Sequence, residues 1–172
     1  MILAVDVYYK DAKAKAAGVL FEKWEDEKPA KVFSCAIDKV ANYEPGCFYK
    51  RELPCIEELL KQIDVKSLCA IVVDGYVYLD DEKRPGLGHY LYEKLSKETP
   101  VIGVAKNEFI NNKQNTKEVL RGESLNPLFV TAVGYDLDEA AEGVTKMHGE
   151  HRMPTLLKLL DNNTKNSNER KL

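Results

Sequence analysis

Residues 2–9 read ILAVDVYY, a dense apolar run rich in β-branched and aromatic side chains, with a single charge, Asp6, inside it. Such a run is typical of a strand that is buried on both faces of a sheet. Two similar runs follow at 68–73 (LCAIVV) and at 101–105 (VIGVA). We expect these three runs to form the centre of a sheet, where the burial of Asp6 requires a reason.

The segments between these runs predict the rest of the sheet. Residues 16–24 and 31–37 have the composition of strands and are joined by a charged, proline-containing stretch, so the chain opens with a three-strand antiparallel meander. Apolar residues at helical spacing predict helices at 54–63, starting at Pro54, and at 87–97. The alternation of strand and helix implies parallel pairing of the central strands. The sequence therefore predicts an α/β fold, a mixed sheet flanked by helices.

The second half of the chain is more polar. Residues 107–126 are rich in Asn and Lys, and we expect them to form a mobile excursion outside the core. A short strand at 128–133 and helices at 138–147 and 154–161 follow. These elements complete the predicted domain.

Composition limits the class of protein. A chain of 172 residues, 44% hydrophobic, fits one domain, which we assign to 1–161, followed by a polar tail at 162–172 that we expect to be disordered. We predict a cytoplasmic protein without membrane contact, because the chain has no signal-peptide pattern and no apolar run near the roughly 18–20 residues that span a bilayer. The four cysteines form no CxxC pair and are expected to be free thiols. No apolar stripe stands out, so we expect a monomer.

Charge narrows the possible partners. The formal net charge of -3 argues against a protein that coats DNA, because such binding depends on cationic neutralisation of phosphates. It is compatible with a nuclease, whose carboxylates would be neutralised by bound metal.

Three carboxylates stand in unusual places. Asp6 lies inside an apolar strand, Asp74 ends another, and Glu52 lies beside the turn before the first predicted helix. An unpaired buried carboxylate is costly, so it protonates, pairs with a cation or binds a metal. If the strands of Asp6 and Asp74 are neighbours, the two carboxylates converge and suit Mg²⁺ or Mn²⁺, which prefer oxygen ligands. Taken singly, Asp6 could pair with a buried base, Asp74 could begin a turn, and Glu52 could be a surface charge.

A series of short motifs resembles the endonuclease V family. The order of the motifs, and most of their spacings, match from residue 2 to about residue 161. Any one of them alone would be uninformative, whereas seven in order are specific. They are Val5-Asp6, Tyr43-Glu44-Pro45-Gly46, Arg51-Glu52-Leu53-Pro54, Val72-Val73-Asp74-Gly75, Pro85-Gly86-Leu87-Gly88, the stretch from Thr99 to Lys106, and Arg152-Met153-Pro154.

The resemblance implies a ribonuclease-H-like fold and a metal-dependent endonuclease of DNA repair, which cleaves DNA or RNA near a deaminated purine, inosine. The cofactor would be Mg²⁺ or Mn²⁺. By the same resemblance, the metal carboxylates would be Asp6, Glu52 and Asp74, with Asp161 supporting a second metal, and Lys106 would face the scissile phosphate. The residues implied to contact nucleic acid are Tyr43, which would fill the gap left by a base turned out of the stack, Pro45, Gly46, Arg51, Gly75 and Arg152.

The chain departs from the family pattern in two places. Asp6 lies only a few residues after Met1, so the usual N-terminal helical segment is missing from this sequence. Val77 stands where the family has a glycine, and its branched side chain would narrow a base pocket. Two other functions therefore remain open: a ribonuclease-H-like nuclease with a structure- or RNA-directed specificity, and a non-catalytic nucleic-acid-binding relative.

Overall fold

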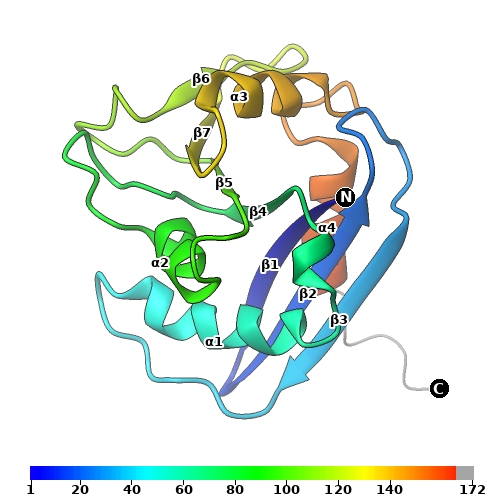
Figure 1. Cartoon of the computed structure of the whole chain (residues 1–172), viewed down its shortest axis with the longest axis vertical. Helices are drawn as coiled ribbons and strands as arrows, with labels where there is room; N and C mark the ends of the chain where they lie inside the picture. Colours follow the sequence, from blue (N-terminus) through cyan, green and yellow to red (C-terminus); the bar gives the residue numbers. More distant parts are fainter. Residues whose placement is uncertain (166–172) are drawn as a thin grey trace.

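The computed structural model describes residues 1–165, which form one seven-stranded mixed sheet in the order β3-β2-β1-β4-β5-β7-β6 (Figure 1). Neighbouring strands β1, β4 and β5 are parallel, and the remaining pairs are antiparallel. The predicted meander followed by parallel strands is confirmed. The strands are β1 (Ile2–Lys10), β2 (Lys13–Phe21), β3 (Lys31–Ile37), β4 (Ala70–Asp74), β5 (Val101–Ala105), β6 (Lys117–Val119) and β7 (Leu128–Val133).

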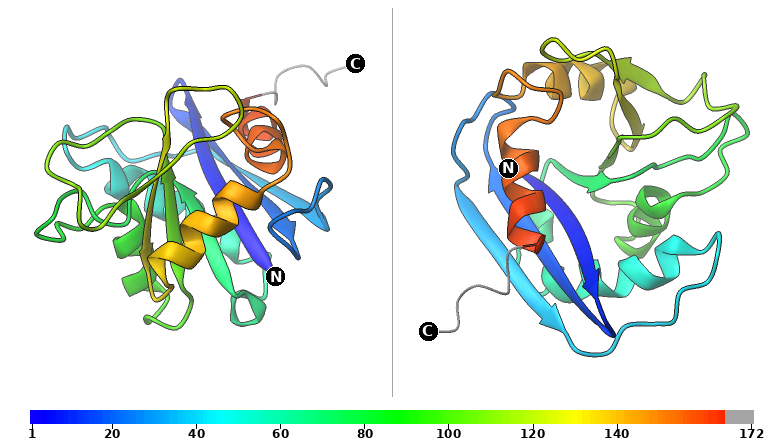
Figure 2. Two further views of the ribbon diagram at one scale, coloured as in Figure 1. Left: turned by 90° about the horizontal axis from the view of Figure 1, so that it is seen from above. Right: turned by 180° about the vertical axis from the view of Figure 1, so that it is seen from behind.

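Helices cover both faces of the sheet (Figure 2). Helices α1 and α2 pack on one face, and α3 and α4 pack on the other. Two apolar clusters result, one on each side of the central strands. The helices are α1 (Phe48–Leu60), α2 (Leu87–Lys94), α3 (Leu137–Lys146) and α4 (Thr155–Lys165), with a short 3₁₀ helix, η1 (Val65–Ser67).

The alternation of side chains along β1 decides where Asp6 points. Leu3 and Val5 belong to the cluster under α1 and α2, whereas Ile2 and Ala4 belong to the cluster under α3 and α4. Successive residues of a strand face opposite sides of a sheet. Asp6 therefore faces the side covered by α4, just beyond the apolar part of that interface.

Helix α1 begins earlier than predicted. The N–H of Cys47 donates to the carbonyl of Glu44 (3.0 Å), and this turn leads directly into the helix at Phe48. Pro54 lies in the helix interior, where its ring removes one hydrogen bond, and not at its start. Glu52 is consequently a helical residue, not part of the preceding turn.

The expectation of a mobile excursion at 107–126 is wrong. The segment contains β6, and its Asn112 and Arg121 side chains are buried. Asn112 donates to the carbonyl of Tyr78 (2.7 Å), and the carboxylate of Asp81 accepts from the N–H of Lys113 (2.6 Å). Polar composition here reflects side chains that bind backbone groups of a neighbouring loop.

Helix α4 is longer than predicted and reaches Lys165. Residues 162–165 of the expected tail are thus helical, and the remainder of that tail lies outside the described residues. Among residues 1–165 we find no helix with the length and apolar composition needed to cross a membrane. The four cysteines, Cys35, Cys47, Cys55 and Cys69, are free, as expected.

Candidate active site

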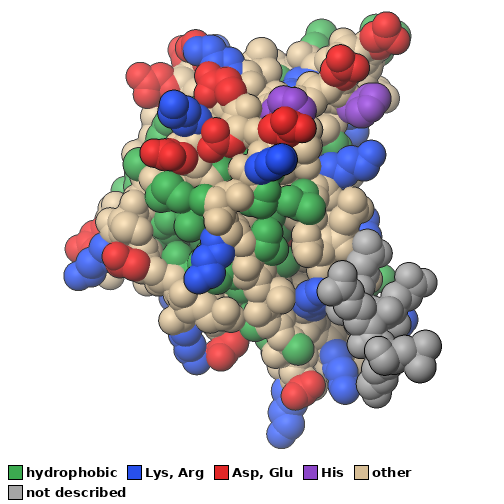
Figure 3. Space-filling model, turned by 90° about the vertical axis from the view of Figure 1, so that its right-hand side faces the viewer, with side chains coloured by type: hydrophobic (Ala, Val, Ile, Leu, Met, Phe, Trp, Pro, Cys, Tyr) green, Lys and Arg blue, Asp and Glu red, His purple; other side chains and the backbone are tan. Residues whose placement is uncertain are grey.

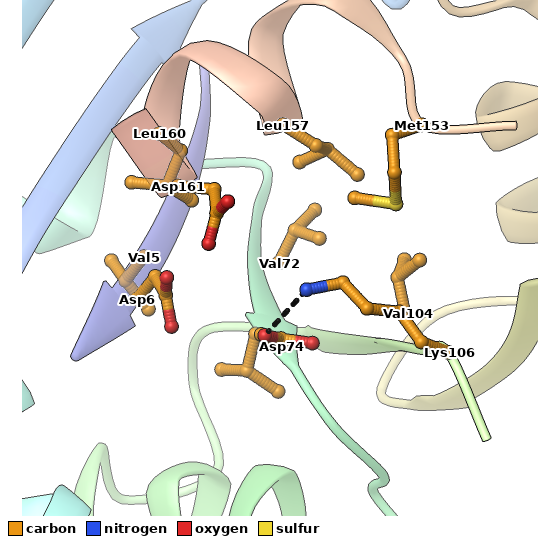
Figure 4. A pocket seen from close by; sticks show the side chains of 11 residues that line it. Val5, Asp6, Val72, Asp74, Val104, Lys106, Met153, Leu157, Leu160 and Asp161 are labelled. Carbon is orange, nitrogen blue, oxygen red and sulfur yellow. Dashed lines mark hydrogen bonds and ion pairs between the residues drawn. The ribbon is translucent and has the colours of Figure 1, made fainter. Parts of the chain in front are cut away.

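Asp6, Asp74, Lys106 and Asp161 line one pocket at the edge of the sheet (Figure 4). Asp6 comes from β1, Asp74 ends β4, Lys106 follows β5, and Asp161 comes from α4. The rest of the wall is apolar, which lowers the local dielectric constant around these charges. Its residues are Val5, Val72, Val73, Val104, Met153, Leu157 and Leu160.

Parallel pairing explains why residues distant in sequence meet here. Val5 is in register with Val73, so Asp6 and Asp74 occupy equivalent places at the carboxyl ends of two neighbouring strands. Asp74 is in turn in register with Val104, two residues before Lys106. The carboxyl ends of parallel strands are the usual ligand-binding edge of such sheets. Asp6 and Asp74 therefore meet in one pocket, as expected if their strands are neighbours.

Asp6 is held as a buried acid. Burial raises its pKa to about 6, and the nearby charges of Asp74 and Asp161 act in the same direction. The N–H of Val7 donates to Asp6 Oδ1 (2.9 Å), which favours the ionised form but does not outweigh burial. The Asp6 carboxyl is therefore close to half ionised near pH 6 while no cation neutralises it.

Glu52 reaches the same charged region from the other side of the sheet, on α1. It does not line the pocket formed by Asp6 and Asp74. Burial raises the pKa of Glu52 to about 8, and the charges of Asp6 and Asp74 add to the effect. The carboxylates of this trio therefore interact electrostatically, although one of them lies behind the pocket wall.

Lys106 supplies the positive charge of the pocket. Its Nζ lies 3.3 Å from Asp74 Oδ2, and both side chains remain partly exposed. Arg152 stabilises the backbone at this point, because its guanidinium donates to the carbonyls of Lys106 and Pro127. Arg152 thus has its Nη2 committed to main-chain oxygens and its Nε buried, so the predicted contact with nucleic acid would have to use Nη1.

The residues predicted to contact nucleic acid lie in two places. Tyr43 is 53% exposed and packs edge-to-face against Phe48, with ring centroids 5.5 Å apart. Gly46 has a φ of +78°, as the turn before α1 requires. Arg51 lies over the ring of Tyr9, 3.9 Å from its centroid. Pro45 belongs to the same exposed turn.

Gly75, directly after Asp74, has a φ of +141° and open space where a side chain would lie. Backbone can be approached closely at such a position. Two residues further, Val77 is fully buried against α2, and its N–H donates to Thr131 Oγ1 (2.8 Å). The expectation that Val77 narrows a base pocket is wrong, because its side chain fills the core.

Sequence reasoning missed two polar residues around the pocket. The hydroxyl of Thr164 lies 3.3 Å from Asp6 Oδ2, and it comes three residues after Asp161 on α4. A longer predicted helix would have placed it on the same face as Asp161. Arg121, 5% exposed, donates to the carbonyls of Met147, Gly149 and His151 and so fixes the loop before α4. No sequence pattern marks that role.

The donor set suits a hard divalent cation. Three carboxylates, Asp6, Asp74 and Asp161, line the pocket with Lys106, and Lys165 pairs with Asp161 beside it (2.8 Å). Glu52 interacts with Asp6 and Asp74 from outside the pocket, and burial and mutual repulsion raise the pKa values of Asp6 and Glu52. Oxygen ligands of this kind are those that Mg²⁺ and Mn²⁺ prefer. Within residues 1–165 no three His, Cys, Asp or Glu side chains are close enough together, as they stand, to hold a metal ion. The residues fit such an ion by their chemistry, and Lys106 lies where it offsets part of their charge.

Comparison with known proteins agrees with this geometry. A structure of endonuclease V from Ciona intestinalis, a D234N variant in complex with DNA that contains an inosine followed by a ribo-adenosine, has a TM-score of 0.79 at 20% identity over 95% of this chain and 83% of that one. The structure of human ENDOV has a TM-score of 0.69 at 20% identity, over 95% of this chain and 82% of that one. The structure of endonuclease V from Streptomyces avermitilis has a TM-score of 0.67 at 26% identity, over 94% of this chain and 80% of that one.

These likenesses confirm the predicted ribonuclease-H-like fold. No curated protein matches the chain. The family model described as Endonuclease V matches residues 1–162, nearly the whole chain. The chain therefore belongs to the endonuclease V family, and it is an endonuclease.

Proposed function

We propose that this protein is a metal-dependent endonuclease that hydrolyses a phosphodiester bond near inosine in DNA or RNA. The observation that carries the proposal is the pocket in which Asp6, Asp74 and Asp161 meet beside Lys106. A protein that only bound nucleic acid would have no use for clustered carboxylates, which repel phosphate.

Each residue has a part in this proposal. Asp6, Glu52, Asp74 and Asp161 would hold Mg²⁺ or Mn²⁺, and Thr164 would orient Asp6. A divalent ion at such a site supplies activation of water and neutralisation of the leaving oxygen. Lys106 would place its ammonium against the phosphate and stabilise negative charge as it develops. Because Lys106 also pairs with Asp74, its position is set before substrate arrives.

Substrate recognition is proposed from the family and from the exposed turn before α1. The Ciona protein was crystallised with inosine-containing DNA, and we propose the same class of ligand here. Tyr43, exposed and supported by Phe48, would stack in the space left by an extruded base. Gly75 would allow the nucleotide to approach the backbone beside Asp74.

The test uses end-labelled single-stranded and duplex oligonucleotides, with and without one inosine, in Mg²⁺, Mn²⁺ or EDTA. We expect metal-dependent cutting near inosine by the wild type and none by Asp74→Asn. Cutting that ignores inosine would replace the proposed specificity with a structure- or RNA-directed one. Measurable binding without cutting in any metal would overturn the catalytic proposal.

A further inference from the structure

A second feature on the face covered by α4 is a basic groove of about 540 Å³ beyond the acidic pocket. It lies between the β1–β2 hairpin, β3 and the end of α4, which lie side by side (Figure 2). Four lysines line the groove: Lys10, Lys13, Lys15 and Lys165. The other lining residues are Tyr8, Asp11, Ala14, Ser34, Cys35 and Ala36.

This concentration of lysine contrasts with the whole chain, which carries a formal net charge of -3. Figure 3 shows Lys and Arg side chains interspersed with Asp and Glu over one side of the molecule. The groove is partly neutralised, because Asp11 lines it and Lys13 lies 3.9 Å from Asp38. Lys10 and Lys15 have no ion pair within residues 1–165. The groove therefore presents positive charge that the described part of the fold does not use.

The pairing of β1 with β2 places like charges opposite each other. Lys10 is in register with Lys13, next to the turn, and Lys15 is in register with Tyr8. Residues in register share a face, and like charges directly opposite each other on a sheet are destabilising. An anion bound over the lysines on this face would remove that repulsion. The arrangement costs stability in the free protein and suits a partner with closely spaced negative charges.

The groove lies next to the acidic pocket. Asp6, Tyr8 and Lys10 alternate along one face of β1, so Lys10 lies about 13 Å beyond Asp6 at the rise of a strand. Lys165 joins the two sites, because it lines the groove and its Nζ lies 2.8 Å from Asp161 Oδ2. One strand of B-DNA advances about 3.4 Å per phosphate along the helix axis. The distance from Asp6 to Lys10 therefore corresponds to a few nucleotides.

We propose that this groove binds the sugar–phosphate backbone of the nucleic-acid strand next to the bond that is cut. The inference rests on the proposed function for its substrate class and extends it by a binding site outside the acidic pocket. Lysines contact phosphates as point charges without reading the base, so the groove contributes affinity and register but no inosine specificity. Tyr8 lies between Asp6 and Lys10 on the same face of β1 and lines the groove.

The experiment measures binding separately from cutting. The affinity of Asp74→Asn protein for a fluorescent single-stranded oligonucleotide is followed by anisotropy over a series of salt concentrations. The same background then carries Lys10→Gln, Lys13→Gln and Lys15→Gln together. A matched control carries Lys66→Gln, Lys94→Gln and Lys146→Gln, three exposed lysines on other surfaces.

Each lost contact with a single strand lowers the slope of log affinity against log salt by about 0.7, so the groove variant should lose about 2 from its slope. Over a fourfold rise in salt, the affinity of the parent should then fall roughly 15 to 20 times more than that of the variant. The control should keep the slope of the parent. Equal slopes for the groove variant, the control and the parent would overturn the proposal.

Two further readouts separate the possible failures. Thermal unfolding of the groove variant should show a midpoint equal to or above that of the parent, because repulsion between Lys10 and Lys13 is gone. A lower midpoint with an unchanged slope would also count against the groove. Absence of metal-dependent cutting by the wild type would reject the proposed function and leave the salt slope as an independent result.

Discussion

The acidic pocket and the basic groove lie on the same face of the sheet and differ in how their charges are held. Asp6 in the pocket and Glu52 on the opposite side of the sheet are each only partly exposed, and burial raises their pKa values. The lysines of the groove stand at a hairpin tip and a helix end, where they remain in contact with solvent. The carboxylates of the pocket are suited to a part in cutting, whereas the exposed lysines of the groove are suited to attracting the phosphates of nucleic acid. Removing one should therefore affect the rate of cutting, and removing the other should affect salt-dependent binding.

The largest expected effect is that of Asp6→Asn on the rate of cutting. Replacing a residue behind a metal ligand usually costs about 10- to 100-fold, and loss of a ligand should cost more. Single-turnover cleavage of a labelled inosine oligonucleotide measures the rate, and anisotropy should show nearly unchanged binding. Asp64→Asn, at an exposed position far from the pocket, is the control. A rate within tenfold of the wild type would contradict the role of Asp6.

Lys106→Met should have the next largest effect. The substitution keeps most of the length of the side chain but removes the ammonium beside Asp74, so we expect cutting to slow by about 10²- to 10³-fold. Lys94→Met, on the exposed side of α2, should leave the rate unchanged. If Lys106→Met slows cutting but keeps the wild-type dependence of affinity on salt, Lys106 belongs to the acidic pocket and not to the groove. A loss of affinity without a loss of rate would place Lys106 with the groove lysines instead.

Thr164→Val should have a smaller effect, because the Thr164 hydroxyl contacts the carbonyl oxygen of Asp161 (2.8 Å) and Asp6 Oδ2 (3.3 Å) and would act through these residues. We expect a loss of rate of about 10- to 100-fold, the range for groups that orient ligands. Thr164→Ser, which keeps the hydroxyl, should recover most of the rate. Thr145→Val removes a hydroxyl that donates to the carbonyl of Ala141 on α3 and controls for helix stability. Equal rates for the Val and Ser variants would exclude the hydroxyl from the site.

The smallest effect concerns stability without added metal. The pKa of Glu52 rises on folding from 4.5 to about 8. Between these two pH values the folded protein therefore binds more protons than the unfolded chain does. The free energy of unfolding should fall as pH rises through this window, by at most about 1.4 kcal/mol per unit, and the full cost is present above pH 8. The raised pKa of Asp6 lowers the free energy of unfolding in the same way as pH rises from 3.8 to about 6.

Urea unfolding in EDTA tests this dependence, because above pH 6 Glu52 should dominate it. Glu52→Gln should flatten the curve between pH 6 and 8 and leave the fall at lower pH in place. An unchanged slope in that variant would show that Glu52 is not held as a buried acid.

Apolar runs were enough to locate most of the sheet from sequence. Strands β3, β5 and β7 have the predicted bounds. β5 and β7 are mostly buried apolar runs, whereas β3 is largely exposed and was located by its β-branched and aromatic composition. Helix α1 was placed too late, since Pro54 resembles a helix start but lies inside the helix. The prediction for 107–126 is wrong because the segment is tied to a distant loop: Asn112 donates to the carbonyl of Tyr78, and the N–H of Lys113 donates to Asp81. Sequence spacing does not reveal such contacts.

The candidate site was predictable to the extent that it follows strand ends. The convergence of Asp6 and Asp74 followed from the sequence only on the condition that their strands are neighbours, and the pairing of β1 with β4 meets that condition. The hydroxyl of Thr164 and the groove lysines escaped notice, because their proximity depends on how α4 crosses β1 and β2. Tertiary packing of a helix on a sheet leaves no local signal in the sequence.

The most direct test of the account is Mn²⁺ binding to the free protein, followed by electron paramagnetic resonance, with wild type and Asp6→Asn compared at pH 8. The acidic pocket should give the wild type a saturable loss of the free-ion signal, which Asp6→Asn weakens strongly and which the groove variant leaves unchanged. Identical titrations for wild type and Asp6→Asn would contradict the assignment of these carboxylates as the metal site.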